Sequence, residues 1–575
     1  MVSAAGTVSA ARYGHSRPVR ATGAPTLRIV ALGPVAPRRA QQVLCDAVVP
    51  TGMKIALTPL EFMRRARALY GEREAVVDGE LRLTYAHFFD RCDRWASALQ
   101  SFGITRGDRV AYIAPNTHAQ LESFYSVAQL GAVVVPVNFR LTPSDFAYII
   151  NHSGARIVCV HEDQLAAVAS IRARCPGVER FVALEGTAGG FVDYEAALAQ
   201  ATGGVRRPEI DEDDLISINY TSGTTAQPKG VMVTHRNAYI NSVGTLVAIH
   251  MTPDDRYLWT LPMFHANGWT FVWTVTAVGA THVCLRKVEA ARIFALAAAE
   301  EITVLCAAPT VLIGVANAPK ALLETARPGV RVLTAGAPPA AATIERIEDD
   351  LGWDVTQVYG LTETSPFISY CEPLAAHASL SRRERAMLKA RQGVELVTSG
   401  ELLVVDDDGN EVPRDGATIG EIVVRGNVVM AGYYNDADAT AQAFRGGYFH
   451  TGDAAVLHPD GYAQIRDRIK DVIISGGENI SSVEVEGVLL RHPSVAEVAV
   501  VGMPDERWGE TPHAFVVFRA GAHATQDELR TFARAELAGF KIPKAVHVVE
   551  ELPKTATGKI QKFVLRGNAF SIAPQ

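Results

Sequence analysis

The sequence has few cysteines, and none of them are grouped. Seven occur singly, with no CxxC pair and no Cys/His cluster. Neither a zinc site with the usual ligand spacing nor a disulfide framework is therefore indicated. We expect reduced thiols in the protein core and a cytoplasmic location. The seven are Cys45, Cys92, Cys159, Cys175, Cys284, Cys306 and Cys371.

Long apolar runs and a strong positive charge are also lacking. The richest apolar run, FVWTVTAVGATHVCL at Phe271–Leu285, carries His282 and is shorter than the ~18–20 residues of a membrane span. We interpret this run as a buried helix and strand. The formal net charge is −7, and no dense stripe of Lys and Arg runs through the main part of the chain. We therefore expect neither a transmembrane segment nor a nucleic-acid partner.

Acidic residues are missing from the start of the chain. Arginine occurs repeatedly before the first acid, Asp46. This bias is typical of an organellar transit peptide. It fits equally well a translation start placed too far upstream, because MKIALTPLEF at Met53 is an ordinary beginning. Both alternatives stay open, and we expect residues 1–52 to be a poorly ordered extension without a function.

What the sequence does contain is the pattern of a folded protein with several domains. Its 575 residues exceed what one hydrophobic core usually supports. Between Thr58 and Asp467, strands such as RVAYIA (Arg109–Ala114) alternate with helical stretches, which indicates an α/β sheet. Past Glu395, short strands and turns indicate a small β-rich subdomain. We expect a large domain at 53–469 and a small domain with mixed helices and strands at 470–575.

One loop concentrates groups that bind anions. YTSGTTAQPKG (Tyr220–Gly230) lies between two strand-like segments, so it predicts a hairpin connection. A hairpin lacks the helix N-terminus of a Walker A loop, and Gly230 follows Lys229 where Ser or Thr would be needed. Hydroxyl groups, close backbone approach and one ammonium group can nevertheless hold phosphate. Taken alone, the loop could equally be a flexible Ser/Thr/Gly turn.

The loop and four further motifs together resemble the acyl-adenylate-forming superfamily of AMP-binding enzymes, in its acyl-CoA synthetase branch. These motifs are VYGLTET (Val358–Thr364), YFHTGD (Tyr448–Asp453), DRIKDVIISGGENISSVEVE (Asp467–Glu486) and LPKTATGKIQK (Leu552–Lys562). They occur in the family's order, and the resemblance covers roughly Thr58 to Phe570. Ala226 departs from the glycine of many members, and we expect little effect because alanine is small.

The resemblance implies a fold and a reaction. The fold is α/β, with a large N-terminal domain of stacked α/β sheets, a small β-barrel-like subdomain and a mobile small α+β C-terminal domain. In the implied reaction a carboxylate attacks the α-phosphate of ATP to form acyl-AMP and pyrophosphate. The thiol of CoA then attacks the acyl carbonyl and releases AMP. Because an anion approaches a polyanion, the site needs positive charge and hydrogen-bond donors.

The resemblance assigns most of the motif residues to ATP. Asp453 takes both ribose hydroxyls, Arg468 holds the ribose or the phosphates, and Tyr359 stacks on adenine. Lys559 is the lysine essential for adenylation, because an ammonium group on a flexible stem can bridge the substrate carboxylate and the α-phosphate. The implied ATP-binding residues are Thr221, Ser222, Gly223, Thr224, Thr225, Lys229, Gly336, Ala337, Pro338, Tyr359, Gly360, Thr362, Asp453, Arg468 and Lys559.

Metal and CoA binding are implied in the same way. Glu363 matches the family's Mg²⁺-binding glutamate, and Mg²⁺ suits one carboxylate with phosphate oxygens. Thr224 is the second implied metal ligand, and Thr362 joins Glu363 and Lys559 as a catalytic residue. Between the half-reactions the small domain rotates about Lys470 and brings the CoA loop SGGEN to the site. The implied CoA-binding residues are Ser475, Gly476, Gly477 and Glu478.

The sequence gives less information about which carboxylic acid is the substrate. LPMFHANGW (Leu261–Trp269) is where the family places the acyl pocket, so His265 and Trp269 are the candidate pocket residues, although His265 could be a core histidine. The string is similar to enzymes for short- to medium-chain fatty and related acids. We expect a stand-alone acyl-CoA synthetase whose partners are a carboxylic acid, ATP and CoA. The alternatives are a ligase that loads a carrier protein and a nucleotide-binding regulatory protein without catalysis. A homodimer stays open.

Overall fold

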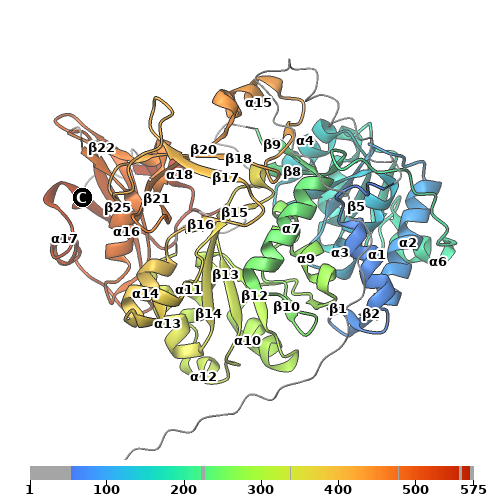
Figure 1. Cartoon of the computed structure of the whole chain (residues 1–575), viewed down its shortest axis with the longest axis horizontal. Helices are drawn as coiled ribbons and strands as arrows, with labels where there is room; N and C mark the ends of the chain where they lie inside the picture. Colours follow the sequence, from blue (N-terminus) through green and yellow to red (C-terminus); the bar gives the residue numbers. More distant parts are fainter. Residues whose placement is uncertain (1–52, 222–226, 337–338, 477, 556–559, 570–575) are drawn as a thin grey trace, which may run out of the picture. The chain divides into compact units, whose positions relative to one another are not determined.

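The computed structural model describes residues 53–221, 227–336, 339–476, 478–555 and 560–569. Contacts divide the chain into Met1–Ile55 and Ala56–Gln575, and the described helices and strands lie in the second part (Figure 1). Residues 1–52 lie outside the described residues, as do some motif residues named below. The domain boundaries that we expect at 52/53 and 469/470 stay predictions.

The first large sheet is parallel at its centre and antiparallel at its ends. Its strand order is β16-β15-β14-β13-β12-β10-β11-β1-β2. The strands from β14 through β13, β12, β10 and β11 to β1 pair in parallel, whereas β2 pairs antiparallel with β1, β15 with β14, and β16 with β15. The strands are β1 (Glu74–Asp78), β2 (Leu81–Thr84), β10 (Arg256–Leu258), β11 (Thr281–Val283), β12 (Val304–Ala307), β13 (Arg331–Thr334), β14 (Asp354–Gly360), β15 (Phe367–Tyr370) and β16 (Val394–Glu395).

The second large sheet has the order β19-β9-β8-β4-β3-β5-β6-β7. Its strands from β3 to β8 pair in parallel, while the hairpin β8–β9 and the pair β9–β19 are antiparallel. The strands are β3 (Arg109–Ile113), β4 (Val133–Val137), β5 (Ala155–Val160), β6 (Arg180–Ala183), β7 (Val192–Asp193), β8 (Leu215–Thr221), β9 (Lys229–Thr234) and β19 (Gly432–Tyr433).

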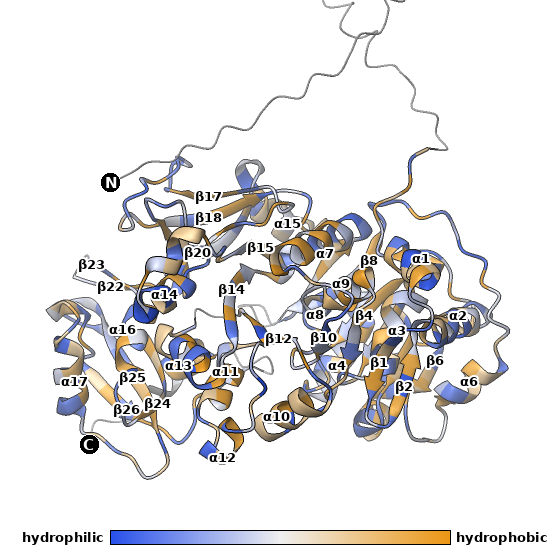
Figure 2. Ribbon diagram, turned by 60° about the horizontal axis from the view of Figure 1, so that its bottom comes forward, coloured by the Kyte–Doolittle hydropathy of each residue, from blue (hydrophilic) through white to orange (hydrophobic). Residues whose placement is uncertain are grey.

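Both large sheets contribute to one hydrophobic core. Val76 and Leu333 of the first sheet and Val110 and Val134 of the second belong to the same buried cluster. Helix α3 (His118–Ser126) is buried along its whole length, as expected for a helix covered on all sides. In Figure 2 the ribbon of β1 is mostly hydrophobic, whereas the ribbons of α1 and α2 carry both hydrophobic and hydrophilic residues, as expected for a buried strand and for half-buried helices. The expected stack of α/β sheets is therefore confirmed.

Helices fill the connections between the strands of the large sheets, as the alternating sequence pattern predicts. Phe271–Leu285 contributes a buried helix and a buried strand, α9 and β11, which confirms that interpretation. The helices are α1 (Leu60–Leu69), α2 (Tyr85–Ser101), α4 (Pro143–Ser153), α5 (Leu165–Ile171), α6 (Tyr194–Gln200), α7 (His235–Ile249), α8 (Ala266–Trp269), α9 (Phe271–Val278), α10 (Ala290–Ala299), α11 (Pro309–Ala316), α12 (Lys320–Leu323), α13 (Ala341–Leu351), α14 (Arg382–Lys389) and α15 (Ala437–Ala443).

The C-terminal third contains two smaller sheets, as expected. The β-rich subdomain is an antiparallel sheet of β17 (Glu401–Val405), β18 (Gly420–Arg425), β20 (Phe449–Leu457) and β21 (Ala463–Arg468). The small α+β domain packs helices on a sheet with its own core around Val485, Val500 and Leu529. Its elements are β22 (Ile473–Ser475), β23 (Glu478–Ile480), α16 (Ser482–Leu489), β24 (Val495–Asp505), β25 (Gly509–Phe518), α17 (Gln526–Arg534), β26 (Ala545–Val548) and α18 (Lys562–Ala569).

The described cysteines agree with the expectation of core thiols. Cys92, Cys159, Cys175, Cys284, Cys306 and Cys371 are each buried and free of disulfides, and Cys45 lies outside the described residues. Every helix in the described part of the chain is too short or too polar to span a bilayer.

Candidate active site

The expected phosphate-binding loop lies between the two strands of a hairpin. β8 ends at Thr221 and β9 begins at Lys229, and these two residues pair across the antiparallel ladder. The predicted hairpin is therefore confirmed, and it differs in kind from a loop that leads into a helix. Thr221 and Lys229 lie at the two ends of the loop. Ser222, Gly223, Thr224 and Thr225 lie outside the described residues.

Aromatic side chains support this hairpin from behind. The Tyr220 hydroxyl and His152 Nδ1 are 2.7 Å apart, and Tyr148 stacks on the imidazole. The Tyr148 hydroxyl also donates to the carbonyl of Pro228, 3.2 Å away, at the other end of the loop. The residues before and after the loop are thus held by the same helix, α4. The motif alone does not reveal this support, because α4 carries no phosphate-binding pattern.

Lys229 and Glu363, which come from separate motifs, meet at Tyr433. The Lys229 ammonium lies 4.7 Å from the centre of the Tyr433 ring. The Tyr433 hydroxyl donates to Glu363 Oε1 at 3.0 Å. Tyr433 occupies β19, which pairs with β9 and so carries this ring beside the loop. The sequence reasoning missed Tyr433, because nothing near it marks a ligand site.

The surroundings of Glu363 suit a magnesium ion. Glu363 follows Thr362 in a short 3₁₀ turn, Thr362–Thr364, just beyond β14, and both residues are half-buried. A single hard carboxylate beside the expected phosphate-binding loop would match the ligands that Mg²⁺ takes, because the ion keeps several waters and phosphate oxygens. Thr224, the other expected ligand, lies outside the described residues.

Asp453, Tyr359 and Arg468 form a second group. The Tyr359 hydroxyl donates to Asp453 Oδ2 at 2.6 Å, and Arg468 Nε lies 2.8 Å from Asp453 Oδ1. Asp453 and Arg468 are cross-strand partners on β20 and β21. Burial raises the pKa of Tyr359, and the Asp453 charge raises it further. Burial lowers the pKa of Arg468, but the neighbouring negative charges, Asp453 first, outweigh this and raise it. The two contacts therefore hold the Asp453 carboxylate in a fixed position.

The expected adenine-binding residues lie at one edge of the first sheet. β13 and β14 are parallel, so Gly336, two residues past the end of β13, and Tyr359, in the last two residues of β14, lie at the carboxyl ends of neighbouring strands. That edge is where α/β sheets usually bind ligands. Gly360 packs so tightly that any β-carbon there would overlap the backbone of Pro366, which requires glycine. Ala337 and Pro338 lie outside the described residues.

The expected acyl-pocket segment has an unusual backbone. Every residue from Ala266 to Thr270 has a positive φ, between 37° and 67°, which forms a left-handed turn. Such a turn costs an L-residue roughly 1–2 kcal/mol, so firm packing must hold it. Trp269 is buried with its ring 5.5 Å from that of Phe367, while His265 is half-buried. The sequence analysis did not anticipate this turn.

The expected hinge and CoA loop lie in the small C-terminal part. Lys470 is exposed in the 3₁₀ turn Ile469–Asp471. Ser475 and Glu478 pair across the β22–β23 hairpin, and Gly476 (φ +60°) lies between them. A β-carbon on Gly476 would lie 2.7 Å from the Trp508 ring, so the ring covers this loop. Gly477 and the predicted catalytic Lys559 lie outside the described residues.

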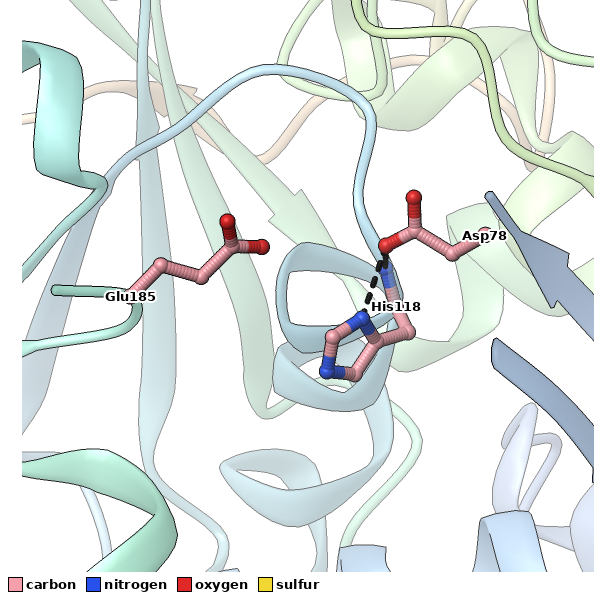
Figure 3. Close-up of side chains that lie close together, drawn as sticks. All are labelled: Asp78, His118 and Glu185. Carbon is pink, nitrogen blue, oxygen red and sulfur yellow. Dashed lines mark hydrogen bonds and ion pairs between the residues drawn. The ribbon is translucent and has the colours of Figure 1, made fainter. Parts of the chain in front are cut away.

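A further ionisable cluster lies elsewhere in the large domain (Figure 3). Asp78, His118 and Glu185 could in principle hold a metal ion. However, Arg286 already donates to Glu185 at 2.7 and 2.9 Å and to Asp78 at 3.3 Å. Burial lowers the pKa of His118, but hydrogen bonds to Asp78 and Glu195 outweigh it and raise this pKa to about 9. Because Arg286 pairs with both carboxylates and His118 Nδ1 lies 2.7 Å from Asp78, we interpret the cluster as an ion network whose charges balance one another.

Comparison with known proteins adds independent findings. The profile described as AMP-binding enzyme matches residues 63–434, and that described as AMP-binding enzyme C-terminal domain matches residues 484–559. The chain is 43% identical to 4-hydroxybutyrate–CoA ligase 2 of Metallosphaera sedula over 91% of this chain and 97% of that protein. It is 41% identical to the peroxisomal acetate/butyrate–CoA ligase AAE7 of Arabidopsis thaliana over 90% and 95% of the two chains. The crystal structure of ATP-bound MatB from Rhodopseudomonas palustris superposes with a TM-score of 0.78, at 28% identity over 89% and 99% of the chains.

Proposed function

The chain belongs to the AMP-binding enzyme family and is an ATP-dependent, AMP-forming acid–CoA ligase; we propose that the acid it activates is a short- or medium-chain carboxylic acid. The observation that supports the assignment of the site is the meeting of Lys229 and Glu363, which come from two distant motifs, at the ring and hydroxyl of Tyr433. Asp453, from a third motif, is held by Arg468 in a second group. The size of the acid is supported by relatives named for hydroxybutyrate, acetate and butyrate.

In the first half-reaction, one carboxylate oxygen of the acid attacks the α-phosphorus of ATP. The bond from that phosphorus to the β-phosphate bridging oxygen breaks, and pyrophosphate leaves. Lys229 and the loop hydroxyls hold the phosphates, and Asp453 holds the ribose hydroxyls as a two-oxygen acceptor. Lys559 brings its ammonium group between the acid and the α-phosphate. Glu363 and Thr224 would hold Mg²⁺, which neutralises phosphate charge when bound.

In the second half-reaction, the CoA sulfur attacks the acyl carbonyl. The bond between that carbon and the AMP oxygen breaks, AMP leaves, and the thiol proton passes to solvent. The small domain turns about Lys470 between the steps, because Lys559 has to leave before the thiol can approach. Ser475, Gly476, Gly477 and Glu478 then line the path of the CoA arm. A cytoplasmic location and a homodimer stay predictions, and one relative at 41% identity is named as peroxisomal.

A panel of carboxylic acids tests this proposal. The purified protein is supplied with ATP, Mg²⁺, CoA and straight-chain acids of increasing length, and AMP and acyl-CoA are measured together. We expect equal amounts of AMP and acyl-CoA, with the highest kcat/KM among acids of about two to eight carbons. Conversion of long-chain or aromatic acids in preference to these would contradict the substrate class. Accumulation of acyl-AMP in the presence of CoA would favour a carrier-protein ligase instead.

A further inference from the structure

Two buried asparagines share one serine hydroxyl inside the large domain. Asn219 Nδ2 donates to Ser217 Oγ at 2.9 Å, and Asn267 Nδ2 donates to the same oxygen at 2.6 Å. Ser217 and Asn219 belong to β8, and Asn267 belongs to the left-handed turn. The side chains are almost fully buried, with at most 2% of each residue exposed. A polar group of this kind in a core needs a full set of partners.

The set of partners is incomplete. The other ends of both amides, Asn219 Oδ1 and Asn267 Oδ1, are buried and have no hydrogen-bond partner among the residues that the structure describes. The orientation of an asparagine amide is an assignment, so either end could be oxygen or nitrogen. In the recorded orientation, each amide nitrogen donates to Ser217 Oγ, and each amide oxygen has no hydrogen-bond donor among the described residues. Proteins satisfy such groups with a bound water or a ligand.

The two asparagines lie close in the sequence to the segments that we expect to bind the acid and the phosphates. Asn267 lies between His265 and Trp269, the expected walls of the acyl pocket. Asn219 lies two residues before Thr221 on β8, and successive alternate residues of a strand share a face. Two residues of strand span about 7 Å, so this distance separates Asn219 from the start of the phosphate loop. An acid that reacts at the phosphates would therefore extend its tail toward the asparagines.

We propose that Ser217, Asn219 and Asn267 form a polar subsite of the acyl pocket that binds a hydroxyl group on the tail of a hydroxy acid. This inference rests on the proposed function. An extended four-carbon acid places a terminal hydroxyl about 5–6 Å from its carboxyl group, slightly less than the roughly 7 Å between Asn219 and Thr221 along β8. A hydroxyl both donates and accepts, so it pairs with an amide end in either orientation. A charged tail would lose its hydration beside these neutral groups, so the subsite disfavours it.

The subsite selects against acids of equal size with an apolar tail. Such an acid would displace water from the amides and leave them unpaired. A site built to hydrogen-bond a substrate hydroxyl therefore rejects the analogue that lacks it far better than an apolar pocket rejects a shortened chain.

The test compares 4-hydroxybutanoic acid with pentanoic acid, in which a methyl group replaces the hydroxyl. Both are assayed for acyl-CoA formation by the full-length protein with ATP, Mg²⁺ and CoA. We expect kcat/KM to favour the hydroxy acid by at least tenfold. Asn219→Leu replaces the amide by an apolar group of similar size on a regular strand and is expected to lower this ratio at least tenfold, with the KM for ATP unchanged.

A second variant keeps the test valid if Asn219→Leu does not fold. Asn267→Gly removes the other amide, and glycine adopts the positive φ of 46° at this position without strain. It should also lower the ratio at least tenfold. The matched control is Asn410→Leu in an exposed turn, which should leave the ratio unchanged.

Two results overturn the inference. One is a wild-type protein that uses pentanoic acid as well as or better than the hydroxy acid. The other is a ratio that stays the same in both Asn219→Leu and Asn267→Gly. If unsubstituted short acids are converted in either case, the proposed function stands without the subsite. If the protein converts neither these acids nor any acid of the panel, the proposed function fails, and the subsite fails with it.

Discussion

At the scale of single residues, the Asp453 carboxylate is held in place by its two neighbours. Both of its oxygens already have a partner, because Tyr359 donates to one and Arg468 pairs with the other. The motif residue was predictable from its resemblance to a known ribose-binding position. Its partnership with Tyr359 was not, because the two residues are far apart in the sequence and meet only through the contact between β14 and β20. The expected stacking of Tyr359 on adenine stays a prediction.

Tyr359→Phe tests the importance of this hydrogen bond. The variant keeps the aromatic ring but loses the hydroxyl that orients Asp453. A hydrogen bond to a charged group contributes about 1.5–3 kcal/mol, so we expect the KM for ATP to rise roughly tenfold or more. The KM for the acid should change little. Acid-dependent exchange between ATP and pyrophosphate measures both constants, and an unchanged KM for ATP would show that Tyr359 does not position Asp453.

The raised pKa of His118 predicts that the protein loses stability as the pH rises. Hydrogen bonds to Asp78 and Glu195 outweigh burial and raise its pKa to about 9, above its ordinary value of 6.5. Because the folded-state pKa is raised, the stabilisation is fully present below about pH 6.5 and is lost as pH rises through about 9. This difference between the two pKa values corresponds to a contribution of roughly 3 kcal/mol at most to the free energy of unfolding.

The comparison with His118→Asn measures this effect. The thermal midpoint of the wild type should exceed that of the variant most at pH 6, and the gap should narrow steadily up to pH 9.5. Arg286→Lys serves as a control, because it keeps a positive charge beside Asp78 without changing the imidazole. A gap that is constant or that widens with pH would mean that His118 is not protonated in the folded protein.

At the scale of elements, the hairpin of β8 and β9 holds the two ends of the predicted phosphate loop. The segment is recognisable as a hairpin because strand-like composition flanks the loop on both sides. Its support by α4 could not be predicted, since His152 and Tyr148 show only the ordinary spacing of a half-buried helix. The left-handed turn at Ala266–Thr270 escaped prediction for a related reason. Asn and Gly tolerate a positive φ, but Ala, Trp and Thr adopt it only when surrounding contacts impose it.

Tyr220→Phe tests whether the support matters for ATP. The change removes the hydrogen bond to His152 and keeps the ring in the core. We expect a loss of about 1 kcal/mol in stability and a rise of severalfold in the KM for ATP, without a change in the KM for the acid. Tyr148→Phe, which loosens the other end of the loop at Pro228, should act in the same direction. Equal effects on both substrates would indicate a general loss of structure rather than a role in holding the loop.

At the scale of the whole molecule, the alternating pattern was enough to predict stacked α/β sheets followed by smaller β-rich and α+β parts. The order of the strands was not predictable, because pairing such as β8 with β4 depends on packing among distant segments. This order matters for function. It places the ends of β8, β14 and β19 so that Thr221, Glu363 and Tyr433 lie around one region. Lys559, which completes the proposed site, comes from a different part of the chain.

The central claim is that two half-reactions share one site and use Lys559 in only the first. The most direct measurement follows each half-reaction separately in Lys559→Ala. We predict that acid-dependent exchange between ATP and pyrophosphate falls at least a hundredfold, while conversion of pre-formed acyl-AMP and CoA to acyl-CoA continues near the wild-type rate. Equal loss of both half-reactions, or retention of exchange, would contradict the account.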